Sequence, residues 1–221
     1  MSRNPLPENR EAISENTTGR LSVYLRCLTF LEQQGTETIS SQELADRFHL
    51  NSAQIRKDLA NFGEFGTRGV GYNVSRLKEQ LVHTLGIDRK RNVLIVGAGN
   101  LGMALADYAG FNGAGFEIVA LVDVDPEKVG RASRSGIPVL PYLHLDRIVR
   151  ENAVEIGVIA VTADSAQEVH DALVAAGVAA VLNFAPVQIR TPERVKVKTV
   201  DLRINLESLS FFLKNVEDGV I

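Results

Sequence analysis

The sequence has little of what disulfide-linked, metal-binding or membrane proteins require. Its 221 residues include one cysteine, so no disulfide can form within the chain. The histidines are scattered without the spacing of metal ligands, which predicts no metal site. No apolar run approaches the roughly 18–20 residues that span a bilayer. The polar N-terminus also lacks an apolar stretch of signal-peptide length. We therefore expect a cytoplasmic protein that does not contact a membrane.

Positive charge is also scarce, because the formal net charge is -3 and the sequence pI is about 5.9. This balance excludes a uniformly basic nucleic-acid binder, although it leaves room for a local basic patch. Charged residues make up 23% of the chain, an ordinary share for a globular protein. The length allows one large domain or two modest domains, each able to bury a core.

Two capping-box spacings predict a helix-turn-helix in the N-terminal part of the chain. An apolar period of i, i+3, i+4 and i+7 first predicts a helix over residues 20–31. Ser40 with Glu43, and Asn51 with Gln54, then have the spacing at which a side chain caps a helix start. Two short helices joined by a tight turn are the outline of the helix-turn-helix, whose second helix enters the DNA major groove.

A glycine-rich segment after Phe62 predicts a β-hairpin attached to these helices. Gly66, Gly69 and Gly71 permit tight turns, and apolar residues alternate after them as in a short strand. A further helix is expected over residues 75–85. Together these elements predict a winged helix-turn-helix domain.

The second helix of the motif has a polar outer face. At about 100° per residue, Ile55, Leu59 and Phe62 cluster on the core side, and Arg56 and Asp58 are expected to flank the outer face. Lysine suits phosphates or guanine, whereas glutamine and asparagine suit adenine edges. Residues 54–78 also carry a positive net charge; the alternative is a solvated helix face. The predicted DNA contacts are Gln54, Arg56, Lys57, Asn61, Arg68 at the tip of the wing, and Tyr72.

Beyond residue 88, apolar strands alternate with helices. Near-continuous apolar runs such as VLIVG and IVALVD are typical of a parallel sheet covered on both faces. The fold class is therefore predicted as α/β, with an N-terminal winged helix-turn-helix and a C-terminal Rossmann domain built on a doubly wound parallel sheet. The expected strands are 92–96, 117–123, 156–161, 179–183 and 195–200, and the expected helices are 101–111, 143–152, 165–176 and 205–216. The expected divisions are a tail over 1–18, a winged helix over 19–87, a Rossmann domain over 88–204 and a C-terminal helix with its tail over 205–221.

A dinucleotide fingerprint follows the first of these strands. Gly97, Gly99 and Gly102 have G-x-G-x-x-G spacing where the strand ends and a helix begins. The helix start offers free N–H groups to phosphates. Asp123, at the end of the next strand, can accept hydrogen bonds from a ribose and would repel a 2'-phosphate. This predicts NADH/NAD+ rather than NADP(H), and a tight turn without a ligand is the alternative. The predicted contacts are Gly97, Ala98, Gly99, Asn100, Leu101, Gly102 and Asp123, with Thr162, Ala163 and Asn183 at the carboxyl ends of later strands.

Four segments together resemble the redox-sensing transcriptional repressor family called Rex. They are QIRKDLANFGEFGTRGVGY (54–72), VLIVGAGNLG (93–102), DVDPEKVG (123–130) and VLNFAP (181–186). The resemblance covers nearly all of residues 20–215. It implies a homodimer whose C-terminal helix is swapped onto the partner subunit. It also implies that NADH favours a closed dimer that leaves its pseudo-palindromic operator DNA, whereas NAD+ permits binding.

Three residues acquire a role only from this resemblance. It implies that Asp201 comes near the nicotinamide of the partner subunit, and that Tyr108 and Arg26 join the linked set of hydrogen bonds. Leu202 stands where an aromatic residue can follow the aspartate in the family. The apolar face of the C-terminal helix is then expected to pack on the partner through Leu206, Leu209, Phe212 and Leu213.

Three alternatives are weighed against this interpretation. An NAD-dependent dehydrogenase needs a proton-transfer group, and His144 and His170 are expected on helix surfaces. Coenzyme A or another nucleotide could occupy the same Rossmann frame. Cys27 could sense redox state directly, although a lone cysteine in a small helical domain is typically a buried core residue. The predicted function is a transcriptional repressor, not an enzyme, that senses the NADH/NAD+ ratio.

Overall fold

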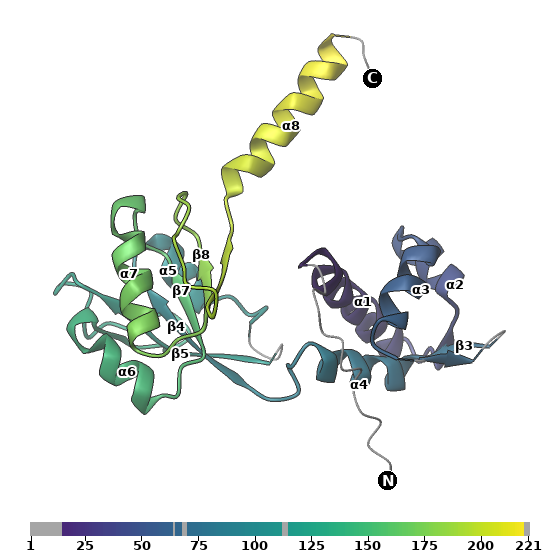
Figure 1. The fold of residues 1–221 in the computed structure, drawn as a ribbon, viewed down its shortest axis with the longest axis horizontal. Helices are drawn as coiled ribbons and strands as arrows, with labels where there is room; N and C mark the ends of the chain where they lie inside the picture. Colours follow the sequence, from purple (N-terminus) through teal and green to yellow (C-terminus); the bar gives the residue numbers. More distant parts are fainter. Residues whose placement is uncertain (1–14, 64, 68–69, 112–114, 219–221) are drawn as a thin grey trace. The chain divides into compact units, whose positions relative to one another are not determined.

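The chain divides into two compact units between Arg89 and Lys90. The computed structural model describes residues 15–63, 65–67, 70–111 and 115–218 (Figure 1). Among these residues, no helix is long and apolar enough to cross a membrane.

The N-terminal unit is a winged helix-turn-helix. Its three short strands form an antiparallel sheet in the order β1-β3-β2. The prediction of a hairpin wing is therefore confirmed, although the additional strand, β1, was not expected. The elements are α1 (Glu15–Gln33), β1 (Thr38–Ile39), α2 (Ser41–Phe48), α3 (Ser52–Ala60), β2 (Gly66–Thr67), β3 (Gly71–Asn73) and α4 (Val74–Thr84).

The two helices of the motif begin where the capping signals place them. The Ser40 side chain accepts a hydrogen bond from the Glu43 backbone N–H, and Glu43 accepts one from the Ser40 backbone N–H, which completes the capping box. Asn51 likewise accepts from the Gln54 backbone N–H at the start of α3. The turn between α2 and α3 depends on His49, which adopts a left-handed conformation with φ 53°.

The core of this unit contains the residues that the helical periodicity selects. Leu21, Tyr24 and Leu28 of α1 are buried, and Ile55 and Leu59 of α3 pack into the same cluster. The side chain of Phe62 packs against the cluster while partly exposed. The predicted core face of α3 is therefore confirmed.

The C-terminal unit is built on a six-stranded parallel sheet in the order β6-β5-β4-β7-β8-β9. Because β5 and β7 lie on opposite sides of β4, the strand order reverses at β4, and ligands of open α/β sheets bind at such points. The strands are β4 (Arg91–Val96), β5 (Phe116–Asp123), β6 (Val139–Pro141), β7 (Ile156–Ile159), β8 (Ala180–Asn183) and β9 (Lys196–Thr199). The helices are α5 (Asn100–Ala106), the 3-10 turn η1 (Tyr142–His144), α6 (Leu145–Glu151), α7 (Ala163–Ala175) and α8 (Leu202–Glu217).

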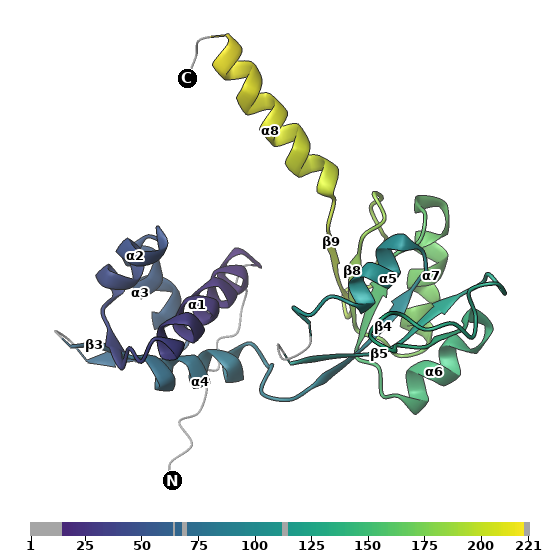
Figure 2. The same cartoon turned by 180° about the vertical axis from the view of Figure 1, so that it is seen from behind.

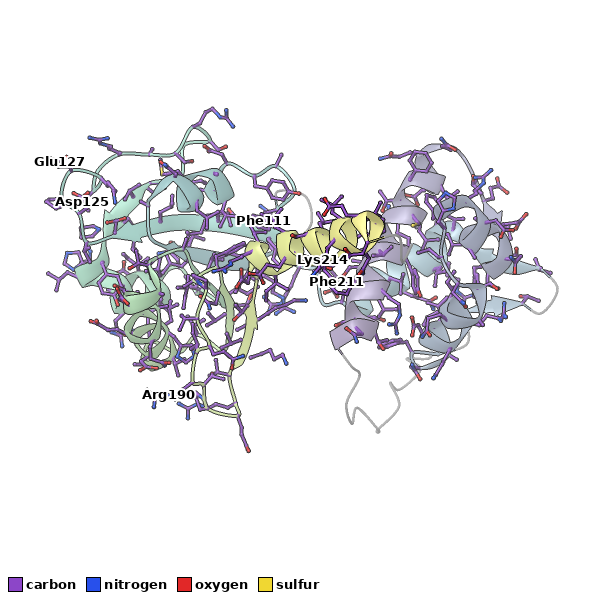
Figure 3. The ribbon with its side chains drawn as sticks, turned by 90° about the horizontal axis from the view of Figure 1, so that it is seen from above. Phe111, Asp125, Glu127, Arg190, Phe211 and Lys214 are labelled. Carbon is purple, nitrogen blue, oxygen red and sulfur yellow. The ribbon has the colours of Figure 1, made fainter. Side chains whose placement is uncertain are left out.

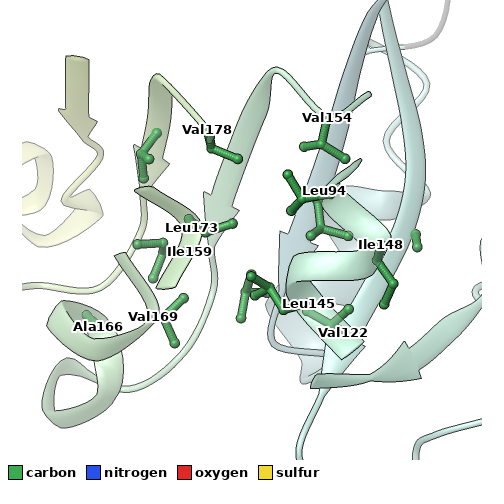
Figure 4. Packing of buried hydrophobic residues seen from close by; sticks show 14 of the residues in the cluster. Leu94, Val122, Leu145, Ile148, Val154, Ile159, Ala166, Val169, Leu173 and Val178 are labelled. Atoms are coloured by element: carbon green, nitrogen blue, oxygen red, sulfur yellow. The ribbon is translucent and has the colours of Figure 1, made fainter. Parts of the chain in front are cut away.

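Alternate residues of the strands feed two separate cores, one on each face of the sheet. Leu94 and Val96 of β4 pack with the buried residues of α6 and α7, such as Leu145 and Leu173 (Figure 4). Val93 and Ile95 point to the opposite face and form a second cluster with the residues around α5. Helices therefore cover both faces, as the apolar strands predict (Figure 1, Figure 2).

The final helix differs from the other α-helices because no described residue along it is buried. It begins at Leu202, whereas the sequence predicted a start at Asn205. Phe211 and Lys214 both project from it (Figure 3). Its exposed apolar side chains are Leu202, Ile204, Leu206, Leu209, Phe211, Phe212, Leu213 and Val216.

His170 corrects the prediction that the histidines of the helices lie on the surface. Its side chain on α7 is fully buried. One ring nitrogen lies 2.9 Å from the Asp171 carboxylate and the other lies 3.1 Å from the Thr191 hydroxyl. His170 therefore links α7 to the loop before β9 through Thr191 and does not face a substrate.

Candidate dinucleotide site and DNA-binding face

The glycines of the fingerprint are required by different features of the turn after β4. Gly97 has φ +104°, and a Cβ there would lie 2.5 Å from the Ala160 carbonyl oxygen. A Cβ at Gly102 would lie 1.8 Å from the Gly97 carbonyl oxygen. By contrast, a Cβ at Gly99 would meet nothing within 4 Å. Gly97 and Gly102 therefore shape the turn, while Gly99 leaves open space beside the backbone.

The start of α5 fits the phosphates of a dinucleotide. Gly99 is the N-cap residue and makes no side-chain capping bond. The N–H groups of the first helical turn have no acceptor within the helix, and the partial positive charge of a helix N-terminus favours an anion. Open space at Gly99 and uncapped donors beside it are the features that a pyrophosphate needs.

Asp123 lies at the end of β5 beside this turn and is 9% exposed. Its carboxylate accepts hydrogen bonds from the backbone N–H groups of Ala98 at 2.7 Å and Asp125 at 2.9 Å. Burial raises the pKa of Asp123, but these N–H groups and the Lys128 ammonium outweigh burial, so the pKa falls below its usual value. Asp123 is thus an ionised acceptor that also holds the glycine turn in place.

Lys128 was not among the predicted site residues. Its Nζ lies 3.2 Å from Asp123 and 3.5 Å from Asp125. The only signal in the sequence was its place in the segment DVDPEKVG, five residues beyond Asp123. A bound ribose would therefore meet a carboxylate that is already paired with an ammonium group.

A pocket lies next to the glycine turn at the carboxyl ends of β4, β5 and β7. Gly97 and Asp123 contribute to one side of it, and Tyr142 and Glu168 contribute from η1 and α7. Burial and the nearby Glu168 carboxylate raise the pKa of Tyr142. Tyr142 and Glu168 were missed because their contribution depends on the fold rather than on a local motif.

The later strand ends give a mixed result. Thr162 and Ala163 are exposed at the start of α7, where Thr162 makes no side-chain capping bond. Asn183 is fully buried, and its amide nitrogen donates to the carbonyl oxygens of Ala185 and Val187. Its side chain also accepts from the Ala185 backbone N–H. The predicted cofactor contact of Asn183 is therefore corrected, since its polar atoms shape the loop and present no surface to a ligand.

The three residues that the family resemblance singled out lie on different elements. Tyr108 follows α5, is 57% exposed and packs edge-on against Phe111 with ring centroids 5.1 Å apart. Asp201 caps α8 by accepting from the Arg203 backbone N–H at 2.9 Å. Arg26 is exposed on α1, in the N-terminal unit. In the described part of the chain, no group of three or more acidic, histidine or cysteine side chains is placed to hold a metal ion.

Asp107 anchors the end of α5 beside Tyr108. Its carboxylate accepts hydrogen bonds from the backbone N–H groups of Ser135 at 2.7 Å and Arg134 at 3.2 Å. The Ser135 N–H is the main reason that the pKa of Asp107 falls to about 2. Because the folded-state pKa is depressed, this stabilisation is present above the ordinary pKa near 4 and is lost as the pH falls toward 2.

Replacing Asp107 with asparagine is therefore expected to lower the thermal unfolding midpoint at pH 7. The difference from the parent should shrink as the pH is lowered from about 4 to 2, because the parent then loses the same charged interaction. Thermal unfolding of both proteins, followed by circular dichroism at pH 7 and at intervals from about pH 4 to 2, measures this difference. Asp146→Asn, on an exposed face of α6, is the control. A difference in unfolding midpoint that does not change with pH would contradict the stabilising role of the ionised Asp107 carboxylate.

The outer face of α3 presents several of the predicted DNA contacts to solvent. Lys57, Arg56 and Asn61 are exposed, and Arg56 donates to the Ser41 hydroxyl at 2.9 Å. Gln54 is partly exposed. Asp58 corrects the prediction, because it is buried rather than flanking the outer face. Its burial results from partners on α1 that a helical wheel of α3 cannot include.

The wing carries two of the predicted DNA contacts, Tyr72 and Arg68. Tyr72 is half-buried against the core of the N-terminal unit, and its ring packs so closely on Gly66 that a Cβ there would lie 2.9 Å from it. Burial raises the pKa of its hydroxyl. Tyr72 therefore supports the wing through its ring. Arg68, predicted at the tip, lies outside the described residues.

Comparison with known proteins agrees with both units. Residues 12–60 match a family model described as the N-terminus of putative DNA-binding proteins, and residues 88–187 match a CoA binding domain. The redox-sensing transcriptional repressor Rex of Carboxydothermus hydrogenoformans is 50% identical over 202 residues, which are 91% of this chain and 97% of that protein. The Rex protein of Desulfitobacterium hafniense is 48% identical over 199 residues, 90% of this chain and 94% of the relative.

Solved structures of Rex-family proteins match nearly the whole chain. RSP, a Rex-family repressor, in complex with β-NAD+ and operator DNA matches with a TM-score of 0.89 and 36% identity, covering 96% of both chains. RSP in complex with β-NADH matches with a TM-score of 0.84 and 34% identity, covering 96% of this chain and 98% of that chain. The chain therefore belongs to the Rex family of redox-sensing transcriptional repressors.

Proposed function

We propose that this chain represses transcription by binding operator DNA and is released from the DNA by NADH. The observation that carries the proposal is the pairing, in one chain of this family, of an exposed recognition helix with an open glycine turn. On α3, Arg56, Lys57 and Asn61 face solvent, where lysine and arginine suit phosphates and asparagine suits a base edge. We expect the protein to act in the cytoplasm.

The C-terminal unit is proposed to hold the dinucleotide by its phosphates and its adenosine ribose. The backbone at Gly99 and the uncapped N–H groups of α5 face the pyrophosphate. Asp123 accepts hydrogen bonds from the ribose hydroxyls and disfavours a ribose phosphate. This preference argues for NADH and NAD+ over NADP(H), and also over coenzyme A, whose ribose is phosphorylated.

The signal must come from a difference between the two forms of the nicotinamide. The oxidised ring is cationic and the reduced ring is neutral. Only a group that interacts differently with the two forms can shift a conformational equilibrium. We infer that Asp201 is this group and that Tyr108 and Arg26 transmit its state. Asp201 already fixes the start of α8 through the Arg203 backbone N–H, so a change at Asp201 acts directly on that helix.

The second copy of the chain is proposed to cover α8. Leu202, Leu206, Leu209, Leu213 and Val216 are exposed and repeat at intervals of four and three residues. This spacing is the seam along which helices pack against one another. Leaving such a stripe in water is unfavourable, because each buried leucine contributes about 1.5–3 kcal/mol. A twofold dimer also matches a pseudo-palindromic operator.

The direct test is fluorescence anisotropy of the full-length protein on labelled operator DNA at fixed salt, because DNA affinity depends strongly on salt. NADH, NAD+ and coenzyme A are titrated separately into the complex. Release by NADH, with NAD+ opposing it, supports the proposal. In Asp201→Ala, DNA binding should persist while the response to NADH is lost.

Other results would favour the alternatives. DNA binding that is unchanged by NADH and NAD+ but changed by coenzyme A would identify coenzyme A as the regulatory ligand. Steady oxidation of NADH by a carbonyl compound would favour a dehydrogenase, which family membership does not support. Direct sensing by Cys27 is disfavoured, because the thiol is buried and burial raises its pKa, which lowers its reactivity.

A further inference from the structure

A buried carboxylate lies on the inner side of the recognition helix. Asp58 of α3 is 1% exposed. The Arg20 guanidinium donates to both of its oxygens, through Nε at 2.5 Å and Nη2 at 2.7 Å. The Tyr24 hydroxyl donates at 2.9 Å. Both donors come from α1, so three hydrogen bonds join α1 to the inner face of α3.

Stability alone does not account for this cluster. Removing the Asp58 carboxylate from water is costly, whereas the Arg20 side chain stays 35% exposed, and well-packed apolar side chains often stabilise a core as well as such a pair does. A buried ion pair can instead fix one arrangement of the elements that it joins. The hydrogen bonds from Arg20 keep the pKa of Asp58 below its usual value despite burial, so the carboxylate is ionised and acts only as an acceptor.

The fourth hydrogen bond to Asp58 comes from a side chain of α3 itself. Gln54, one turn earlier on α3 and partly exposed, donates its Nε2 amide to Asp58 at 2.8 Å. An ionised carboxylate accepts hydrogen bonds only, so the amide nitrogen of Gln54 must be the end that faces it. The carboxamide oxygen is then left to accept a hydrogen bond from outside the protein. Gln54 consequently does not return the capping bond to Asn51 that its spacing suggested.

We propose that Asp58 is a positioning residue for operator recognition, and that it sets Gln54 as a hydrogen-bond acceptor for a base that carries an amino group. In the major groove those bases are adenine, through N6, and cytosine, through N4. An untethered glutamine would be free to turn either end of its amide toward the bases. The tether to Asp58 removes this freedom before DNA arrives. The inference rests on the proposed DNA-binding function and adds how one base pair is selected.

The test compares base-pair preferences of full-length variants. An operator is first selected from a randomised duplex library with the parent protein. Affinities of the parent, Asp58→Asn, Gln54→Leu and the double variant are then measured for the operator and for each single base-pair substitution. Active concentrations come from stoichiometric titration. Asp46→Asn is the matched control, because Asp46 on α2 accepts from Gln42 at 2.9 Å in the same i, i+4 arrangement but on an exposed face.

Discrimination at one base pair bearing an amino donor should fall about fivefold to tenfold in both single variants. The double variant should lose no more than either single variant, because both act on the same contact. Asp46→Asn should match the parent.

A purely structural role would lower stability in Asp58→Asn and leave the preferences of the folded protein unchanged, which would overturn the inference. Gln54→Leu tests the inference independently, even if Asp58→Asn does not fold. An unchanged profile in Gln54→Leu would also overturn the inference. A parent that is released by NADH but whose variants keep their preferences would leave the proposed function intact and reject this inference alone. A parent that selects no DNA would reject both.

Discussion

Gly99→Val is expected to leave the fold intact and to weaken NADH binding at least about 100-fold, or about 2.7 kcal/mol. A Cβ at Gly99 meets nothing within 4 Å in the protein, and the N-cap residue Gly99 makes no side-chain bond that valine would remove, so the free energy of unfolding should fall by no more than about 1 kcal/mol. The same side chain would occupy the space through which the pyrophosphate reaches the backbone. Each hydrogen bond to a charged group that is lost costs about 1.5–3 kcal/mol.

Isothermal titration calorimetry measures the affinity, and chemical denaturation measures the stability. Gly19→Val is the matched control, because it adds the same side chain to α1 of the N-terminal unit, where a Cβ also meets nothing within 4 Å. Gly102→Ala provides the contrast, since its Cβ would lie 1.8 Å from the Gly97 carbonyl oxygen. That variant should lose stability as well as affinity. Near-normal NADH binding by Gly99→Val would show that the dinucleotide does not use this turn.

The consequence for regulation is a repressor that NADH cannot remove. Gly99→Val should bind operator DNA with the parent's affinity, because the substitution lies outside the N-terminal unit. It should then remain bound at NADH concentrations that release the parent. A loss of DNA binding without NADH would indicate that the glycine turn influences the DNA-binding unit even when no ligand is present.

The sequence predicted those elements that depend on residues close together along the chain. The side chains of Ser40 and Glu43 each accept a hydrogen bond from the other residue's backbone N–H, so the capping box could be recognised without the fold. The glycine fingerprint is also mostly local, because Gly97 has a positive φ and a Cβ at Gly102 would meet the Gly97 carbonyl oxygen of the same turn, although a Cβ at Gly97 would also meet the distant Ala160. The strand β6 was missed because its three residues carry no alternation that a pattern could detect.

The buried polar residues could not be placed from the sequence, because their partners are distant along the chain. Asp58 is held by Arg20, which lies 38 residues earlier, and a wheel of α3 alone puts it beside the outer face. His170 was misplaced for the same reason, since one ring nitrogen bonds to Thr191, which lies 21 residues later in a loop. Asn183 differs, because its amide bonds mainly to Ala185 and Val187 just beyond it, with Thr199 of β9 as a third partner. Such residues look like surface residues until the elements that cover them are known.

Placing an aspartate at the centre of the apolar stripe, in Leu209→Asp, is expected to convert the proposed dimer into a monomer. Leu209 is exposed on α8 and belongs to the stripe with four-and-three spacing. In a twofold dimer each substitution occurs twice, so two buried leucines are lost and two carboxylates must be desolvated. The dimer dissociation constant should rise at least about 100-fold. Sedimentation equilibrium measures this directly.

Lys214→Asp is the matched control, because it adds an aspartate to the same exposed helix outside the stripe. It should remain dimeric. Operator affinity should fall about 100-fold in Leu209→Asp and little in the control, since a dimer engages two half-sites with one association step. A monomeric parent, or a dimeric Leu209→Asp, would mean that something other than a second copy covers α8. Loss of operator binding together with the dimer would show that the two units are functionally coupled. The helix that follows Asp201 would then be needed for DNA recognition by α3.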